Sequence, residues 1–183
     1  MRATILVEGE SDALAVRALA RRLGRDLDGE GVAVLSLGGG GGLDAQLRLL
    51  GPAGRGLRLL GLCDVDHEPR WAARLEAAGL GSGLDRPGLE ALGFFVCDRD
   101  LEDELIRTLG VAAVEGLIAA QGEAHALRTF TKQPAQREVA RADQLRRFLG
   151  TKAGRKARYA PLLVEATVPG EEPRPLREVL ARA

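Results

Sequence analysis

Cysteine and histidine, the residues that build disulfide frameworks and zinc sites, are scarce in this sequence. Its 183 residues contain two cysteines and two histidines, and no C-x-x-C pair. Two cysteines cannot form a disulfide framework, and the sequence gives no indication of a zinc site. Cys63 and Cys97 each end an apolar run, which is typical of cysteines that act as small buried hydrophobes.

Long apolar runs are also missing. No stretch approaches the roughly 18 apolar residues that a transmembrane helix needs. The apolar run at the N-terminus is too short for a signal peptide and is followed by acids. We therefore expect a cytoplasmic protein without a membrane-spanning segment. Hydrophobic residues make up 45% of the chain, which allows a sizeable core, and the length suits one domain with an appended helical piece.

Neither sign of charge is in excess, because 26 basic residues balance 26 acidic ones. The balance hides an uneven distribution along the chain. Residues 126–158 carry ten basic residues but only two acidic ones, Glu138 and Asp143. This stretch predicts a basic helical surface that could contact a phosphate backbone, and an ordinary solvated helix face is the alternative.

Short apolar runs alternate with amphipathic segments through the first 105 residues. The runs over 3–7, 32–37, 57–63 and 92–97 indicate buried strands, and the segments over 11–23, 43–51 and 68–79 indicate helices. Residues 80–92 contain several glycines and a proline and predict a turn region. The alternation predicts an α/β fold with a parallel sheet, whose functional crevice lies beyond the carboxyl ends of the strands.

Acidic residues follow three of these four strands. They are Glu8, Glu10 and Asp12 after the first strand, Asp64 and Asp66 after the third, and Asp98, Asp100, Glu102, Asp103 and Glu104 after the fourth. Three acidic clusters at one edge of a sheet would repel one another unless a cation lay between them. In an extended chain Asp64 and Asp66 project to the same side, so we expect both carboxylates on one face.

The first acidic cluster has a second interpretation, because it also resembles a helix N-terminus. Ser11 could cap that helix, and Asp12 would lie favourably near the positive end of the helix dipole. We expect both roles together, with Ser11 capping the helix while Asp12 turns towards the cations. Glu10 is expected to be solvated or outside the metal's immediate ligands.

Clustered carboxylates suit a hard cation, Mg²⁺ or Mn²⁺, rather than zinc. Two such ions can activate a water and stabilise the leaving oxygen in phosphoryl transfer. His67 could be a further ligand, but we favour a surface histidine at a helix start, and His125 has no cluster near it. No serine or threonine has a convincing base partner, so a nucleophilic triad finds no support.

Five glycines, Gly38–Gly42, follow the second strand. Their backbone N–H groups could approach a phosphate closely at the start of the next helix. No Gly-Lys-Ser/Thr follows, so this is not a P-loop, and a run of glycines is weak support for a dinucleotide site. A flexible turn is the alternative.

Beyond residue 105 the sequence predicts only helices, over 103–120, 122–130, 136–149 and 152–168. The tail from Pro169 ends in a short helix over 176–182 and shows no chemistry. We therefore expect an α/β core over 1–105, a basic helical extension over 106–168 and a tail over 169–183.

These residues resemble a known family. Glu8-Gly9 after one strand and Asp64-x-Asp66 after another resemble a Toprim domain, the module of topoisomerases, primases and several nucleases. The longer pattern Val7-Glu8-Gly9-Glu10-Ser11-Asp12, the later Asp100-Leu101-Glu102 and the glycine run resemble the Toprim region of OLD (overcoming lysogenization defect) nucleases. Lys156-Ala157-Arg158-Tyr159-Ala160 is similar to the lysine that precedes an aromatic-alanine pair in that family.

The resemblance implies metal-dependent DNA cleavage by a Toprim-like, Rossmann-like parallel sheet of about four strands flanked by helices, with a C-terminal helical extension. Two Mg²⁺ or Mn²⁺ ions would be held by Glu8, Asp12, Asp64, Asp66, Asp100 and Glu102. The implied catalytic residues are Glu8, Asp64 and Lys156, with Lys152 as the less favoured lysine. Contacts to DNA are expected from Gly39, Gly40, Arg146, Lys152, Arg155 and Arg158.

Full-length OLD proteins carry an ABC-type ATPase ahead of the Toprim region, and this sequence has no Walker A motif. We therefore expect either a domain that works alone or one that uses a separately encoded ATPase as a partner. Two other functions stay open. One is a nucleotidyl transferase, topoisomerase-like or primase-like enzyme, for which Tyr159 is the only tyrosine, and the other is a non-catalytic DNA-binding module.

Overall fold

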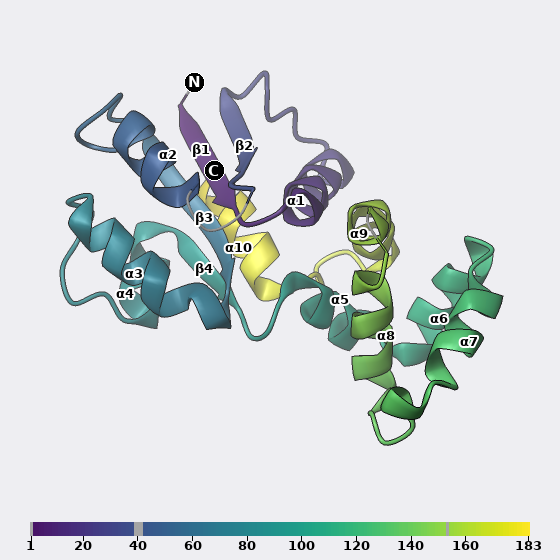
Figure 1. Ribbon diagram of the computed structural model, residues 1–183. Helices are drawn as coiled ribbons and strands as arrows, with labels where there is room; N and C mark the ends of the chain where they lie inside the picture. Colours follow the sequence, from purple (N-terminus) through teal and green to yellow (C-terminus); the bar gives the residue numbers. More distant parts are fainter. Residues whose placement is uncertain (1, 39–41, 153) are drawn as a thin grey trace.

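A four-stranded parallel sheet forms the centre of the molecule. The computed structural model describes residues 2–38, 42–152 and 154–183. Its strands are β1 (Ala3–Val7), β2 (Val32–Ser36), β3 (Arg58–Asp64) and β4 (Phe94–Cys97), in the order β2-β1-β3-β4 (Figure 1). All neighbouring pairs are parallel, which confirms the predicted fold class.

Helices cover both faces of this sheet. The first half of the chain contributes α1 (Glu10–Arg22), α2 (Gly42–Leu50), α3 (Glu68–Ala77) and α4 (Arg86–Leu92). The second half contributes α5 (Leu101–Leu109), α6 (Val111–Ala120), α7 (Ala124–Thr131), α8 (Arg141–Gly150), α9 (Arg155–Ala166) and α10 (Arg174–Arg182). Two short 3-10 helices, η1 (Val65–His67) and η2 (Pro134–Gln136), complete the described elements.

Side chains along each strand point alternately to the two faces of the sheet, and this divides the core into two apolar clusters. Ile5 and Val7 of β1 belong to the larger cluster, with α1, α9 and α10, whereas Leu6 belongs to the smaller one, with α2 and α3. Each strand therefore buries both faces, which explains why its sequence is almost continuously apolar. A Cβ on Gly61 of β3 would lie 2.6 Å from Trp71, so this position has no room for a side chain.

The helical part of the chain packs directly against the α/β part. Helix α9 lies against α1, and α10 lies against β3 and β4. Leu176 and Val179 of α10 are fully buried in the larger apolar cluster. Arg22 of α1 donates hydrogen bonds to the carbonyl oxygens of Val164 and Thr167. The last helix, for which the sequence indicated no role, therefore completes the core. In Figure 1, α6, α7 and α8 extend away from the sheet.

Three local expectations were wrong. The region over 80–92 contains a helix, α4, whose N-cap Asp85 accepts a hydrogen bond from the Gly88 N–H at 2.9 Å. The helix expected over 103–120 is two helices, because the backbone at Gly110 has φ 79° and breaks the helical path. The N-cap of α1 is Gly9 rather than Ser11, and Asp12 accepts its N–H.

No helix in the described ranges has the length and apolar character that crossing a membrane requires.

Candidate metal centre

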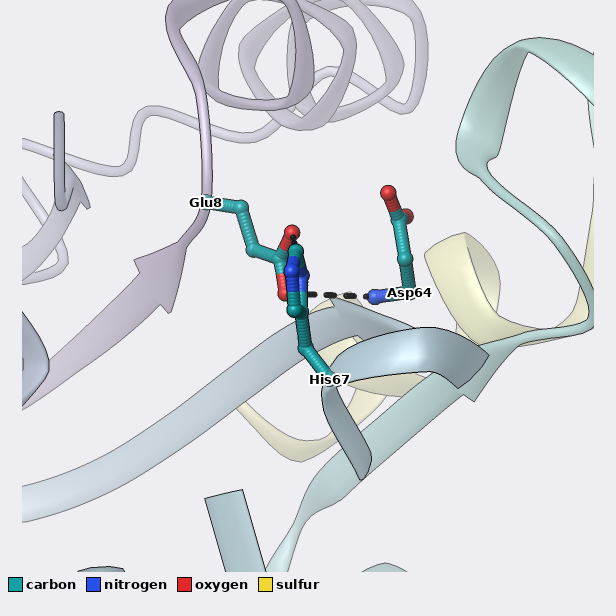
Figure 2. Close-up of side chains that lie close together, drawn as sticks. All are labelled: Glu8, Asp64 and His67. Carbon is teal, nitrogen blue, oxygen red and sulfur yellow. Dashed lines mark hydrogen bonds and ion pairs between the residues drawn. The ribbon is translucent and has the colours of Figure 1, made fainter. Parts of the chain in front are cut away.

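The carboxyl ends of β1 and β3 bring two of the predicted acids together. Strand pairing places Val7 beside Leu62, so Glu8 and Asp64 emerge at the same edge of the sheet. The Asp64 N–H donates to Glu8 Oε1 at 3.4 Å, and Glu8 Oε2 lies 2.7 Å from His67 Nδ1 (Figure 2). Glu8, Asp64 and His67 each have a ligand atom within 4.8 Å of the others. These three residues could therefore hold one metal ion.

Asp12 lies one helical turn into α1, near the same edge. Its Oδ2 accepts the Gly9 N–H at 2.9 Å, which fixes the carboxylate at the start of the helix. Burial and the negative charge of Glu102 raise the pKa of Asp12 to about 7. The carboxylate is therefore only partly ionised at neutral pH unless a cation approaches it.

Asp64 shows the same effect more strongly. Burial is the largest cause that raises the pKa of Asp64 to about 8, and the negative charges of Glu8, Asp12, Asp100 and Glu102 contribute to the same rise. Acids from three strand ends therefore act on one another through space, as the parallel topology predicted. Mutual repulsion of this kind favours proton uptake or cation binding.

Asp100 and Glu102 lie at the start of α5, and both are buried. Asp100 caps the helix, with Oδ1 accepting the Asp103 N–H at 2.8 Å and Oδ2 accepting from Arg146 Nε at 2.6 Å. Glu102 Oε2 accepts from Lys156 Nζ at 3.0 Å. The other oxygen, Glu102 Oε1, is buried and has no hydrogen-bond partner among the described residues.

Asp66 does not share the face that the extended-chain argument predicted. The strand ends at Asp64, and Val65–His67 form the 3-10 helix η1, so the period-two alternation stops there. Asp66 is exposed and is not part of the group formed by Glu8, Asp64 and His67. The turn brings His67 to Glu8 instead. The sequence contained only a weak indication of this, a histidine directly after Asp64-x-Asp66.

The predicted basic residues have different surroundings. Lys156 of α9 lies at the acidic cluster, and burial lowers its pKa while the charge and hydrogen bond of Glu102 raise it, with a net rise. Lys152 is exposed. The Arg158 guanidinium donates to the Gln121 carbonyl oxygen at 3.1 Å. Gly39 and Gly40 lie outside the described residues.

Arg155 is buried, and its guanidinium makes hydrogen bonds within the chain. It donates to the Phe148 carbonyl oxygen at 2.9 Å and to Glu123 Oε1 at 3.1 Å, and it stacks 4.0 Å from the centre of the Phe148 ring. A buried, paired guanidinium stabilises the packing of α8 and α9 and does not face solvent. The expected DNA contact by Arg155 is therefore wrong, because its guanidinium is buried and already paired.

Much of the positive charge in residues 126–158 is balanced by acids elsewhere in the chain. Arg141 pairs with Glu115 and Arg146 with Asp100, besides the pairs of Arg155 and Lys156 described above. The basic residues that are exposed and pair with no acid among the described residues are Arg128, Lys132, Arg137, Arg147, Lys152 and Arg158. The basic surface is therefore smaller than the sequence indicates.

The acidic edge has the properties that a divalent cation requires. Its donors are mainly carboxylate oxygens, which suit Mg²⁺ and Mn²⁺. One buried oxygen of Glu102 lacks a partner, and the pKa values of Asp12 and Asp64 are raised by burial and by like charges. The residues present therefore fit a metal centre.

Comparisons with known proteins agree with this geometry. Residues 1–66 match the family model of the overcoming lysogenization defect protein-like TOPRIM domain. The structure is similar to the C-terminal region of the OLD protein of Xanthomonas campestris pv. campestris, with 27% sequence identity and a TM-score of 0.75. That match covers 98% of this chain and 90% of the other. The chain carries an OLD-like Toprim domain.

A second solved structure, the C-terminal region of the Burkholderia pseudomallei OLD protein, shares the fold of this OLD-like Toprim chain. It has 24% identity and a TM-score of 0.74, and the match covers 98% of this chain and 95% of the other. No curated protein sequence matches the chain significantly. The family predicted from Glu8-Gly9 and Asp64-x-Asp66 is therefore confirmed, and the structural similarity extends through the helical part.

Proposed function

We propose that this OLD-like Toprim chain is a Mg²⁺- or Mn²⁺-dependent DNA endonuclease that nicks or cleaves phosphodiester bonds with two metal ions. The observation that carries the proposal is the meeting of Glu8, Asp12, Asp64 and Glu102 at one edge of the sheet, with Lys156 beside them. Such a site provides both oxygen donors for divalent cations and a positive group for a phosphate.

Each acid has a defined role in this proposal. Glu8, Asp12 and Asp64 from the sheet side, and Asp100 and Glu102 from α5, hold the ions, while the exposed Asp66 contributes at the outer side. The bound ions would activate a water and neutralise charge on the leaving oxygen. The Asp64 N–H holds Glu8 in place, and the Gly9 N–H holds Asp12.

Lys156 supplies the chain's own positive charge at the reacting phosphate. Its raised pKa keeps the ammonium protonated at neutral pH, so it can stabilise negative charge or donate a proton there. The exposed Lys152 has no comparable contact with the acids, which favours Lys156 as the catalytic lysine.

DNA would approach over the helices that carry the unpaired basic residues. Arg128, Lys132, Arg137, Arg147, Lys152 and Arg158 are available for phosphate contacts. Arg146 can contribute through its terminal nitrogens while Nε stays on Asp100. The glycines Gly39 and Gly40 are retained as proposed phosphate contacts from their position after β2.

Tyr159 argues against the transferase or topoisomerase-like alternative. Its side chain is fully buried, and its hydroxyl donates to Glu123 Oε2 at 2.8 Å. Burial and this hydrogen bond raise the pKa of Tyr159 to about 12, so the phenolate that would attack a phosphate is scarce at neutral pH. A covalent adduct through this tyrosine would require the helix to move.

The decisive experiment is the incubation of the purified chain with supercoiled plasmid and Mn²⁺. We expect nicked or linear product from the wild type and none from Asp64→Asn, which removes the charge with little change in shape. Asp28→Asn, at an exposed acid in the turn before β2, is the matched control and should cut normally. Equal nicking by the wild type and by Asp64→Asn would refute the proposal. DNA binding without cleavage would favour the non-catalytic module.

The solved relatives are C-terminal regions of OLD proteins, so a separately supplied ATPase belongs to the proposal as a possible partner. The plasmid assay is therefore repeated with an OLD-type ATPase added in trans. A rise in cleavage that requires ATP would support this partner, and unchanged cleavage would indicate a chain that works without it.

A further inference from the structure

We propose that His67 is a direct ligand of the metal centre, and that its nitrogen makes the site prefer a transition-metal ion such as Mn²⁺ over Mg²⁺. The inference rests on the metal site of the proposed function and specifies which cation that site selects.

The position of His67 is the first observation. The 3-10 helix η1 turns its ring towards the end of β1, where Nδ1 lies 2.7 Å from Glu8 Oε2 (Figure 2). The ring, Glu8 and Asp64 offer three ligand atoms that all lie within 4.8 Å of one another. Ions of this kind bind oxygen at about 2.0–2.1 Å, so two ligands of one ion lie at most about 4.2 Å apart, and a small side-chain rotation would bring these atoms into that range.

Glu102 provides an independent observation that a ligand belongs in this crevice. Its side chain is 5% exposed, and its Oε1 has no hydrogen-bond partner in the part of the chain described. The charge of Glu102 acts on both Asp12 and Asp64, so Glu102 lies close to these acids. A buried carboxylate oxygen without a donor is costly, and a cation would satisfy it.

The two sides of the crevice are not equivalent in charge. Asp100 and Glu102 each have a cationic partner from the helices, Arg146 and Lys156. On the sheet side, the only basic side chain among the described residues that pairs with Glu8 is His67. On the sheet side, the protein's own positive charges therefore repel an added cation least. The imidazole nitrogen of His67 lies on this side.

The chemistry of the donor set leads to the selectivity. Mg²⁺ is bound in proteins almost entirely by oxygen, whereas first-row transition-metal ions also accept imidazole nitrogen, Mn²⁺ the least strongly of them and the later ions more strongly. A site of carboxylates alone would bind Mg²⁺ and Mn²⁺ with similar affinities. One imidazole in place of a carboxylate removes negative charge and adds nitrogen, and both changes disfavour Mg²⁺ relative to Mn²⁺.

The test measures metal binding to the metal-free chain without DNA. Calorimetric titrations with Mn²⁺ and with Mg²⁺ give the ratio of the two affinities for the wild type, His67→Asn and His67→Glu. His125→Asn is the matched control, because His125 is the other histidine and is exposed on α7. Pulsed EPR of bound Mn²⁺ separately reports whether a ¹⁴N nucleus is coordinated.

We expect ¹⁴N coupling in the wild type and in His125→Asn, and its loss in both His67 variants. The preference for Mn²⁺ over Mg²⁺ should fall about tenfold in His67→Glu, which exchanges the nitrogen for an oxygen donor while leaving an acid-rich site. Absence of ¹⁴N coupling in the wild type would overturn the proposal, because His67 would then only hydrogen-bond Glu8. An unchanged preference in His67→Glu would overturn it as well.

The two proposals can fail independently, and the plasmid and metal-binding assays distinguish the two failures. A chain that binds Mn²⁺ through nitrogen but leaves plasmid intact would refute the nuclease and support the ligand. A chain whose His67→Asn variant nicks plasmid with the wild-type preference for Mn²⁺ over Mg²⁺ would support the nuclease and refute the ligand.

Discussion

Asp12 offers the sharpest test of the electrostatics at the acidic edge. Its pKa rises from 3.8 to about 7 in the folded chain, mainly through burial. The unfolded chain therefore loses this proton well below the pH at which the folded chain does. Without metal, the stability contributed by Asp12 should be complete below about pH 3.8, fall as the pH rises towards the folded-state pKa of about 7, and level off above it. Asp64, with a pKa of about 8, extends the fall in the same direction.

The change Asp12→Asn removes the proton equilibrium while keeping an oxygen that can accept the Gly9 N–H. One pKa unit corresponds to about 1.4 kcal/mol, so a rise from 3.8 to about 7 gives an upper limit of roughly 4 kcal/mol. Relaxation and water penetration reduce this value, and we expect the variant to gain about 2–4 kcal/mol at pH 9. At pH 5 the folded carboxyl is neutral but the unfolded one is already ionised, so the gain should fall to less than half of its pH 9 value and vanish only below the unfolded-state pKa of 3.8.

Urea unfolding in EDTA at pH 5 and pH 9 measures both values, with Asp28→Asn as an exposed control that should change neither. Added Mn²⁺ should reverse the order at pH 9, because the wild type binds the ion more tightly and gains more stability from it. The wild type could instead be equally stable at both pH values, with no gain in Asp12→Asn. That result would refute the conclusion that the acids at this edge repel one another.

Three further predictions concern the basic residues. Arg146→Ala should weaken Mn²⁺ binding and plasmid cleavage, because Asp100 loses the Arg146 Nε donor that holds its carboxylate in position. Arg147→Ala should leave Mn²⁺ binding unchanged, and calorimetry compares the two variants. Arg155→Met should lower the free energy of unfolding by about 3 kcal/mol, measured in urea, since Glu123 Oε1 and the Phe148 carbonyl oxygen lose the donor that Arg155 provides. Lys152→Ala should reduce the slope of log K for DNA against log salt by about 1, and an identical slope would remove this lysine from the DNA surface.

The sheet and its acidic edge could be predicted because they depend on local patterns. Apolar runs of strand length, separated by helices, leave few topologies other than a parallel sheet, and such a sheet brings its carboxyl ends together. That reasoning placed Glu8 and Asp64 side by side, as the structure does. It does not depend on any contact between residues far apart in the sequence.

The surroundings of the basic residues could not be predicted in this way. Arg155 and Arg158 look alike in the sequence, yet one is buried against Phe148 and the other is exposed. What separates them is which side of α9 packs against α8, and the sequence of one helix does not specify that packing. His67 is exposed at the start of α3, as predicted, but its contact with Glu8 could not be predicted, because the orientation of its ring depends on a 3-10 turn that ends the extended strand at Asp64.

The pairing of charges changes how the helical part of the chain is understood. The sequence presents residues 106–168 as a basic piece appended to an acidic core. In the structure, α8 and α9 deliver Arg146 and Lys156 to Asp100 and Glu102, and α9 also covers α1. Because α1 carries Asp12 and its buried face needs that cover, the helices determine both the charge and the shape of the acidic edge. They are therefore part of the candidate metal centre as well as the surface to which DNA would bind.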